Sequence, residues 1–217
     1  YKRVVKAAAQ RHDLEATFMA KPFADQAGSG MHIHVSVNDT EGNNIFASED
    51  PEGTDALRHA IGGMIANVGD SFALFAPNAN SYRRFKANSY APVAPTWGGN
   101  NRTVSFRIPA GAPKTRHVEH RACGADANPY LAVAAVLAGM HHGMANQTDP
   151  GPAVVGNGYD RDSSGDDKPP SNWFAAVDRF HASNFMRDYL GARFVDMYSI
   201  VKRVEQDRYF SEVPRLD

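Results

Sequence analysis

The sequence predicts an α+β fold, in which antiparallel strands that carry rows of polar side chains are surrounded by helices. Three observations point to it. Residues 31–38 alternate apolar and polar side chains, which is typical of a strand with one buried face. Asn128 and Pro129 open a long stretch of small apolar residues that suits a helix. Between them, residues 78–113 are rich in proline, asparagine and glycine, so this segment is expected to be mostly loop with one strand.

Five helices are expected, and their local sequence explains where they begin. They cover residues 2–12, 54–68, 129–144, 171–181 and 193–209. In the first, Val4 and Val5 are followed by Ala8 and Ala9, which gives a short apolar face at helical spacing. Thr54 is suited to begin the second, because its hydroxyl can accept a hydrogen bond from a free N–H group of the first turn.

The strands are expected to be short and to carry polar side chains. They cover residues 15–20, 31–38, 103–108 and 117–121, with a turn at 39–44 and a short return at 45–46. In the strand at 31–38, His32, His34 and Ser36 form a row on one face, because successive side chains point to opposite faces. Residues 149–171 are rich in proline, glycine and aspartate, which predicts a flexible loop.

The composition excludes several classes of protein. The 217 residues are 42% hydrophobic and 22% charged, and 23 basic residues balance 24 acidic ones. A nucleic-acid-binding protein normally has a basic excess or a basic stripe, and neither is present. No apolar run approaches the roughly 20 residues that a membrane-spanning helix needs. The single cysteine, Cys123, excludes a disulfide framework and favours a reducing, cytoplasmic compartment. The first residue is not methionine and no signal-peptide pattern follows it, which suggests a fragment.

A first candidate site lies where a Gly-Ser-Gly turn, residues 28–30, leads into the strand with His32 and His34. Glycines allow a ligand to approach the backbone, and two neutral imidazoles side by side can ligate a divalent metal or face a phosphate. Two ordinary surface histidines are the alternative. A cupin-like metal site is disfavoured, because the next acidic residues, Asp39 and Glu41, lie in a turn and not on the strand.

A second candidate site combines Arg102, Arg107, Glu119 and Arg121. Arginine binds phosphate and carboxylate with two parallel hydrogen bonds and stays charged when buried. Glu119 and Arg121 are two residues apart on a strand, so one offers an oxygen ligand for a cation and the other binds an anion on the same face. A structural ion-pair network is the alternative. Residues 83–84 add two more arginines in a loop.

These motifs occur in an order that resembles the C-terminal part of the glutamine synthetase catalytic domain. The matching series is Lys21-Pro22, Gly28-Ser29-Gly30-Met31-His32-x-His34-x-Ser36, Ser81-Tyr82-Arg83-Arg84, Ala91-Pro92, Asn101-Arg102, Arg107-Ile108-Pro109, Glu119-x-Arg121 and Asn128-Pro129-Tyr130-Leu131. The resemblance covers nearly the whole chain and replaces the alternatives above for these residues. It implies that residues 1–217 are the C-terminal portion of that catalytic domain, without the family's N-terminal β-grasp domain and without part of the catalytic domain.

The resemblance also implies a reaction and its cofactors. The family uses ATP to phosphorylate the γ-carboxylate of glutamate, and an amine then attacks the γ-glutamyl phosphate to give an amide. Mg²⁺ or Mn²⁺ ions bridge the phosphates and the carboxylate. The active sites form between neighbouring subunits of a homo-oligomeric ring, most often a dodecamer, so this chain alone is expected to hold half of a site and to be inactive.

By motif position, the resemblance implies a role for each matched residue. His32 and Glu119 would ligate the metal. His34 and Ser36 would lie at the nucleotide. Arg102 and Arg107 would contact the nucleotide and stabilise the transferring phosphoryl group. Gly28, Arg84 and Arg121 would hold the substrate glutamate.

Two departures from the family pattern bear on the amine. Glutamine synthetases carry a loop glutamate, implicated in binding ammonium, where this chain has Tyr90, and they usually have asparagine where this chain has Ala27. Loss of an anionic ammonium site argues for a larger amine, whose carbon chain could use the aromatic wall of Tyr90. The branch most resembled is the γ-glutamylpolyamine, or glutamate–putrescine, synthetases of polyamine catabolism. Glutamine synthetase using ammonia is the alternative within the class, and a non-catalytic scaffold protein is the alternative outside it.

Overall fold

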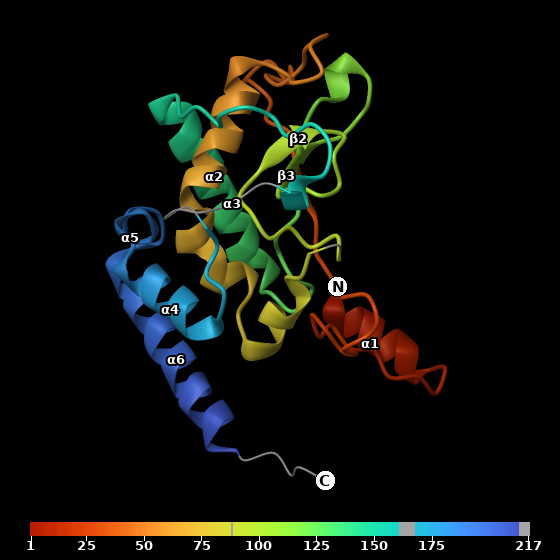
Figure 1. Ribbon diagram of the computed structural model, residues 1–217, viewed down its shortest axis with the longest axis vertical. Helices are drawn as coiled ribbons and strands as arrows, with labels where there is room; N and C mark the ends of the chain where they lie inside the picture. Colours follow the sequence, from red (N-terminus) through yellow and green to blue (C-terminus); the bar gives the residue numbers. More distant parts are fainter. Residues whose placement is uncertain (88, 161–167, 213–217) are drawn as a thin grey trace.

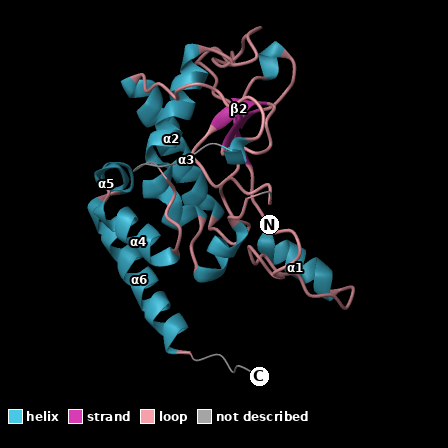
Figure 2. Ribbon diagram, in the orientation of Figure 1, coloured by secondary structure: helices cyan, strands magenta, loops and turns pink. Residues whose placement is uncertain are grey.

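A computed structural model describes residues 1–87, 89–160 and 168–212 and shows helices packed around a small sheet (Figures 1 and 2). The α-helices of these residues are α1 (Lys2–Gln10), α2 (Asp55–Phe75), α3 (Pro129–Asn146), α4 (Trp173–Ala182), α5 (Asn184–Leu190) and α6 (Ala192–Ser211). The strands are β1 (Ile33–Val35), β2 (Trp97–Gly99), β3 (Phe106–Ile108) and β4 (Val118–His120). Short 3₁₀ helices are η1 (Ala79–Arg84), η2 (Pro113–Thr115) and η3 (Gly158–Asp160). The α+β class is confirmed.

The sheet has the order β1-β4-β3-β2 and separates two kinds of side chain. One row across it is Ile33, His120, Phe106 and Trp97, and the next row is His34, Glu119, Arg107 and Gly98. Because side chains alternate between faces, the first row packs into the core and the second forms a polar face. The β1–β4 and β4–β3 pairs are antiparallel, whereas β2 pairs with β3 in parallel, so the expectation of antiparallel strands throughout is wrong at this edge.

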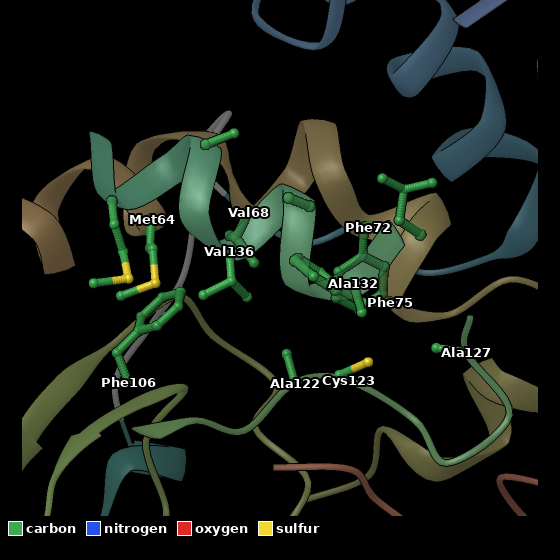
Figure 3. Close-up of a cluster of buried hydrophobic side chains, with 14 of the residues drawn as sticks. Met64, Val68, Phe72, Phe75, Phe106, Ala122, Cys123, Ala127, Ala132 and Val136 are labelled. Carbon is green, nitrogen blue, oxygen red and sulfur yellow. The ribbon is translucent and has the colours of Figure 1, made fainter. Parts of the chain in front are cut away.

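The core lies between the sheet and the long helices α2 and α3, with α4 and α6 packed beyond α2 (Figure 1). Figure 3 shows Met64 and Val68 of α2 and Val136 of α3 above Phe106 of the sheet. Cys123 is fully buried in the same cluster, and burial raises the pKa of its thiol to about 12, so it packs as a small apolar residue. Of the helices described, none is long and apolar enough to cross a membrane.

The helix starts follow the expected capping. Thr54 accepts a hydrogen bond from the Leu57 N–H at the start of α2, and Asn128 accepts one from the Tyr130 N–H at the start of α3. The helix α2 continues to Phe75, beyond the expected end at residue 68. Polar side chains in this last part are satisfied without ending the helix, since the Ser71 hydroxyl donates to the Asn67 carbonyl.

Some predicted strands are wrong or too long. Residues 15–20 form no strand, because this segment pairs with a turn and a side chain: the Ala20 carbonyl accepts from Ser29 and the Lys21 N–H donates to Asn80. The return at 45–46 is reduced to an isolated bridge between Asn38 and Asn44. The strands at 31–38 and 103–108 shorten to β1 and β3, whereas β2 and α5 were not expected at all.

The contact between α2 and α3 depends on glycine. A Cβ at Gly143 would overlap the His59 carbonyl oxygen and the backbone of Gly63, and one at Gly63 would overlap the backbone of Gly139 and Gly143. The helices therefore touch backbone to backbone, and any side chain here forces them apart.

Replacing Gly143 with alanine is expected to lower the free energy of unfolding by about 2 kcal/mol, because overpacking at a backbone contact cannot be relieved by rotating a side chain. Urea denaturation measures this change. The matched control is Gly99→Ala, where a Cβ would meet no atom within 4 Å, and its change should stay within about 0.5 kcal/mol. Equal midpoints for the two variants would contradict the close packing.

Candidate active site

Glu119 is the centre of the polar face of the sheet. It lies on β4, between β1 and β3, and is only 2% exposed. Its Oε1 atom is 2.8 Å from Arg121 Nη1 and 2.8 Å from His32 Nδ1, and its Oε2 atom is 2.8 Å from Arg107 Nη1. Two arginines and a histidine thus converge on one buried carboxylate.

The surroundings of Glu119 keep it ionised. Burial by itself works to raise the pKa of this carboxyl group, but the hydrogen bonds with His32 and Arg107 and the charge of Arg121 outweigh burial. The pKa of Glu119 is therefore lowered well below its ordinary value. The predicted pairing of Glu119 with Arg121 on one face is confirmed in this geometry, and the strand pairing adds Arg107.

The predicted phosphate-contacting arginines occupy different positions. Arg107 spans the site from Glu119 to Asn100, whose Oδ1 accepts from Arg107 Nη2 at 2.6 Å. Asn100 has a left-handed backbone with φ 47°, a conformation that asparagine tolerates better than most residues. Arg102 is exposed, and its carbonyl oxygen accepts from Arg121 Nη2 at 3.0 Å. The turn that carries Arg102 is thereby fixed against the buried cluster, while its side chain stays in solvent.

The Gly-Ser-Gly turn makes room for Arg84. A Cβ at Gly28 would lie 2.8 Å from Arg84 Cγ, and one at Gly30 would lie 3.0 Å from Arg84 Nη1. Arg84 is 6% exposed and donates from Nη2 to the carbonyl oxygen of Ala122. The two predicted glutamate-binding positions, Gly28 and Arg84, are therefore in direct contact, and the glycines are required by the arginine side chain.

A cavity of about 750 Å³ opens beside His34 at the end of the sheet. This volume is within the usual range for small-molecule sites. Predicted His34 and Ser36 line the cavity together with Lys114 and His117, which the sequence analysis did not select. The sequence signal for these two was their position: Lys114 precedes the strand expected at 117–121, and His117 begins it.

The His34 ring is held in one orientation. His34 Nδ1 is 3.0 Å from His117 Nε2, and His117 Nδ1 is 2.8 Å from the Thr115 carbonyl oxygen. Since a carbonyl only accepts, His117 donates from Nδ1; in the neutral tautomer its Nε2 then accepts, and His34 donates from Nδ1. His34 Nε2 then keeps its lone pair, 3.8 Å from Glu119 Oε1. Burial, with Glu119 opposing it, lowers the pKa of His34, so the ring is neutral near pH 7.

Tyr90 is the exposed residue of a short loop, which we call the flap (residues 89–92) and in which Ala91 and Pro92 are buried. Its side chain is 66% exposed, and its backbone is left-handed with φ 56°. The flap precedes β2 in the chain. The Ser89 hydroxyl donates a hydrogen bond to the Arg84 carbonyl oxygen at 3.1 Å, which connects the flap to Arg84. Tyr90 is thus at the surface, and its neighbour Ser89 is hydrogen-bonded to the backbone of the buried Arg84.

The donor set near Glu119 fits part of a cation site. A carboxylate oxygen and imidazole nitrogens are ligands that Mg²⁺ or Mn²⁺ accepts in proteins, and His32 Nδ1 and Glu119 Oε1 already converge to 2.8 Å. Among the residues that the structure describes, no group of three His, Cys, Asp or Glu side chains is arranged to hold a metal ion. His32 and Glu119 therefore suit two ligands of a cation.

Comparison with known proteins identifies the family and agrees with this fold. The family model "Glutamine synthetase, catalytic domain" matches residues 1–217, and the chain belongs to this family. It is 43% identical over 204 residues to the Gamma-glutamylputrescine synthetase PuuA of Escherichia coli K12, covering 94% of this chain and 43% of that protein. It is 36% identical over 220 residues to the Glutamine synthetase of Halobacterium salinarum, covering 98% of this chain and 48% of that protein.

A solved structure has the same fold. The GmaS/ADP complex is similar with a TM-score of 0.87 and 34% identity, over 99% of this chain and 50% of that chain. The chain therefore spans about half the length of the relatives it matches.

Proposed function

We propose that the protein carrying this chain is an ATP-dependent ligase that joins the γ-carboxyl group of glutamate to an amine through γ-glutamyl phosphate. We further propose that the amine is putrescine or another amine larger than ammonia. The observation that carries the proposal is the buried Glu119 carboxylate, held by Arg107, Arg121 and His32 beside an open cavity. Family membership supports the reaction class, and the similarity to the putrescine enzyme supports the amine.

The arginines are suited to the charge changes of this reaction. Phosphoryl transfer depends on positioning and on neutralising the negative charge of the transferring group, and one well-placed arginine can contribute about 10³–10⁵ in rate. The guanidinium group of Arg107 donates from Nη1 to Glu119 and from Nη2 to Asn100. Because both nitrogens are held, little reorganisation is needed when the phosphate binds. Arg102 is exposed and free to fold over the nucleotide phosphates. Arg121 and Arg84, with Gly28 against it, would hold the anionic glutamate.

His32 and Glu119 would hold a Mg²⁺ or Mn²⁺ ion. When bound, the ion neutralises phosphate charge and orients the reacting oxygens. The cavity beside His34 and Ser36 would take ATP, with Lys114 supplying a further positive charge for phosphate. The similar solved structure is a complex with ADP, which supports this choice of ligand.

The proposed assembly is a cytoplasmic homo-oligomeric ring of the family's dodecameric kind, in which a second subunit and the rest of the protein complete each site. The pair of His32 and Glu119 would give two ligands of the cation, and other parts of the protein would complete the site.

The deciding experiment is phosphate release from ATP by the full-length protein with glutamate and either putrescine or ammonium. We expect release with putrescine well above the rate with ammonium. Release driven by ammonium alone would replace the proposal by glutamine synthetase, which the similarity to the Halobacterium enzyme makes the second candidate. The same assay on the 217-residue chain should show no activity.

Replacing Tyr90 with alanine is expected to raise the KM for putrescine about tenfold, because loss of contact with two methylene groups costs about 1.5 kcal/mol. Alanine keeps the backbone preference of an L-residue at φ 56°, so the variant tests the ring and not the loop conformation. The matched control is Tyr130→Ala, at an 84% exposed tyrosine in the first turn of α3. An unchanged KM for putrescine in the Tyr90 variant would remove the aromatic wall from the proposal.

A further inference from the structure

Tyr159 connects a distant loop to the flap. It lies in η3, and its hydroxyl donates to the Ala91 carbonyl oxygen at 3.3 Å, next to Tyr90. The side chain is half-buried, and burial raises the pKa of its hydroxyl, while a hydrogen bond with the Tyr90 backbone and the charge of Arg121 oppose that rise. The hydroxyl therefore contacts the flap at Ala91, next to Tyr90, and lies close enough to Arg121 for that positive charge to act on its pKa.

The flap needs such a contact, because its backbone is strained. A left-handed residue other than glycine costs of order 1 kcal/mol and persists only where its surroundings hold it. Tyr90 is such a residue, with φ 56° and a mostly exposed ring that makes no compensating burial. On its N-terminal side, the Ser89 hydroxyl lies 2.5 Å from the Lys86 carbonyl oxygen and 3.1 Å from that of Arg84. On its C-terminal side, Ala91 and Pro92 are buried, and the Tyr159 hydroxyl donates a hydrogen bond to the Ala91 carbonyl oxygen from outside the flap.

The segment that carries Tyr159 is itself fixed to the polar end of the sheet. The Gly158 N–H donates to Thr103 Oγ1 at 2.7 Å, and Asn101 Nδ2 donates to the Gly156 carbonyl oxygen at 2.8 Å. A Cβ at Gly158 would lie 2.9 Å from the Thr103 carbonyl oxygen, so only glycine allows this approach. Asn101 and Thr103 flank Arg102. Tyr159 is thus mounted on the same turn that presents a predicted phosphate-contacting arginine.

We propose that Tyr159 is a positioning residue that holds the flap in place, so that it fixes Tyr90 relative to the arginine cluster and sets the affinity for the amine. This inference rests on the proposed function for its kinetic consequence, but not for the contact itself. The hydroxyl is the working group, because it makes the hydrogen bond to the flap, whereas the ring of Tyr159 serves only to place it.

The first test compares Tyr159→Phe with the wild-type full-length protein. Loss of one hydrogen bond of typical strength is expected to raise the KM for the amine about fivefold and to leave kcat within twofold and the KM for ATP unchanged. Tyr198→Phe is the matched control, because its hydroxyl also donates to an alanine carbonyl oxygen, that of Ala73 at 2.9 Å, but in the core between α6 and α2. That control should keep the wild-type KM for the amine. An unchanged amine KM in Tyr159→Phe, or an equal rise in both variants, overturns the proposal.

The second test does not depend on the ligase reaction. Lys86 is exposed just before the flap, so tryptic cleavage after it reports how often this loop opens. We expect Tyr159→Phe to be cleaved there about fivefold faster than the wild type, with Tyr198→Phe unchanged. If no amine supports turnover, the proposed function fails, and cleavage still decides the inference. Equal cleavage rates for all three proteins would show that the Tyr159 hydroxyl does not hold the flap in place.

Discussion

Replacing Glu119 with glutamine is expected to lower the free energy of unfolding by about 3 kcal/mol and the kcat/KM for the proposed ligase reaction by about 10³. Glutamine keeps the shape of the side chain but removes the charge that compensates Arg107 and Arg121. The side chain of Arg107 is 14% exposed and that of Arg121 is 5% exposed. The uncompensated guanidinium groups then repel each other across one amide. The reaction suffers further, because the variant lacks the anionic oxygen proposed to bind the cation.

Urea denaturation and phosphate release measure the two effects. The matched control is Glu205→Gln, which removes the same charge from an exposed pair with Lys202 on α6 and should change stability by less than about 0.5 kcal/mol. Because the pKa of Glu119 is lowered in the folded protein, its contribution is present above its ordinary pKa of 4.5 and is lost as the pH falls below that value. The two glutamine variants should therefore converge in stability with decreasing pH. A stable, active Glu119 variant would show that the arginines do not depend on this carboxylate.

The local part of this site could be predicted from the sequence. The alternation in residues 31–38 places His32 and His34 on one face, and both are found near Glu119 Oε1, at 2.8 Å and 3.8 Å. The spacing of Glu119 and Arg121 likewise predicts their contact, since residues two apart on a strand share a face. These relations depend only on the period of a strand.

The non-local part could not be predicted. The contact of Arg107 with Glu119 requires that β3 pair with β4, and no local pattern specifies that pairing. The contact of Arg84 with Gly28 joins residues far apart in the chain, and only the close approach of their atoms explains the glycine. Only the order of the family motifs assigns these residues to one site from the sequence. The strand predicted at 15–20 failed for the same reason, because its backbone partners are a turn and a side chain and not another strand.

His120 was not selected from the sequence, although it follows Glu119 directly. Strand alternation turns it to the opposite face, where it is 1% exposed and packs against Phe75 and Phe106 at ring distances of 4.4 Å and 5.5 Å. Within the described part of the chain, neither of its ring nitrogens has a hydrogen-bond partner. Burial, helped by the positive charge of nearby Arg84, lowers the pKa of His120 from 6.5 to about 3.

This histidine is expected to make the fold sensitive to acid. Between pH 6.5 and pH 3 the unfolded chain binds a proton at His120 that the folded protein does not, so stability falls as the pH falls. The loss is about 1.4 kcal/mol per pH unit, or about 3 kcal/mol at pH 4. In His120→Phe, which keeps an aromatic ring between the two phenylalanines, this loss should disappear. The stability difference between variant and wild type should be constant above pH 7 and grow in favour of the variant below pH 6.

Urea denaturation of both proteins between pH 4 and pH 8 measures this difference. His34 and the carboxylates titrate in both proteins, so their contributions cancel when the two curves are subtracted. His120→Leu separates protonation from packing, because leucine fits the aromatic site less well yet also binds no proton. Both variants should lack the same acid-dependent decrease in the free energy of unfolding, although their stabilities at pH 7 differ.

If the curves of wild type and variants run parallel from pH 8 to pH 4, then His120 is protonated in the folded state or reaches solvent on acidification. Either case would mean that the core behind Glu119 opens, and the closed packing of His120 against Phe75 would then not hold at low pH.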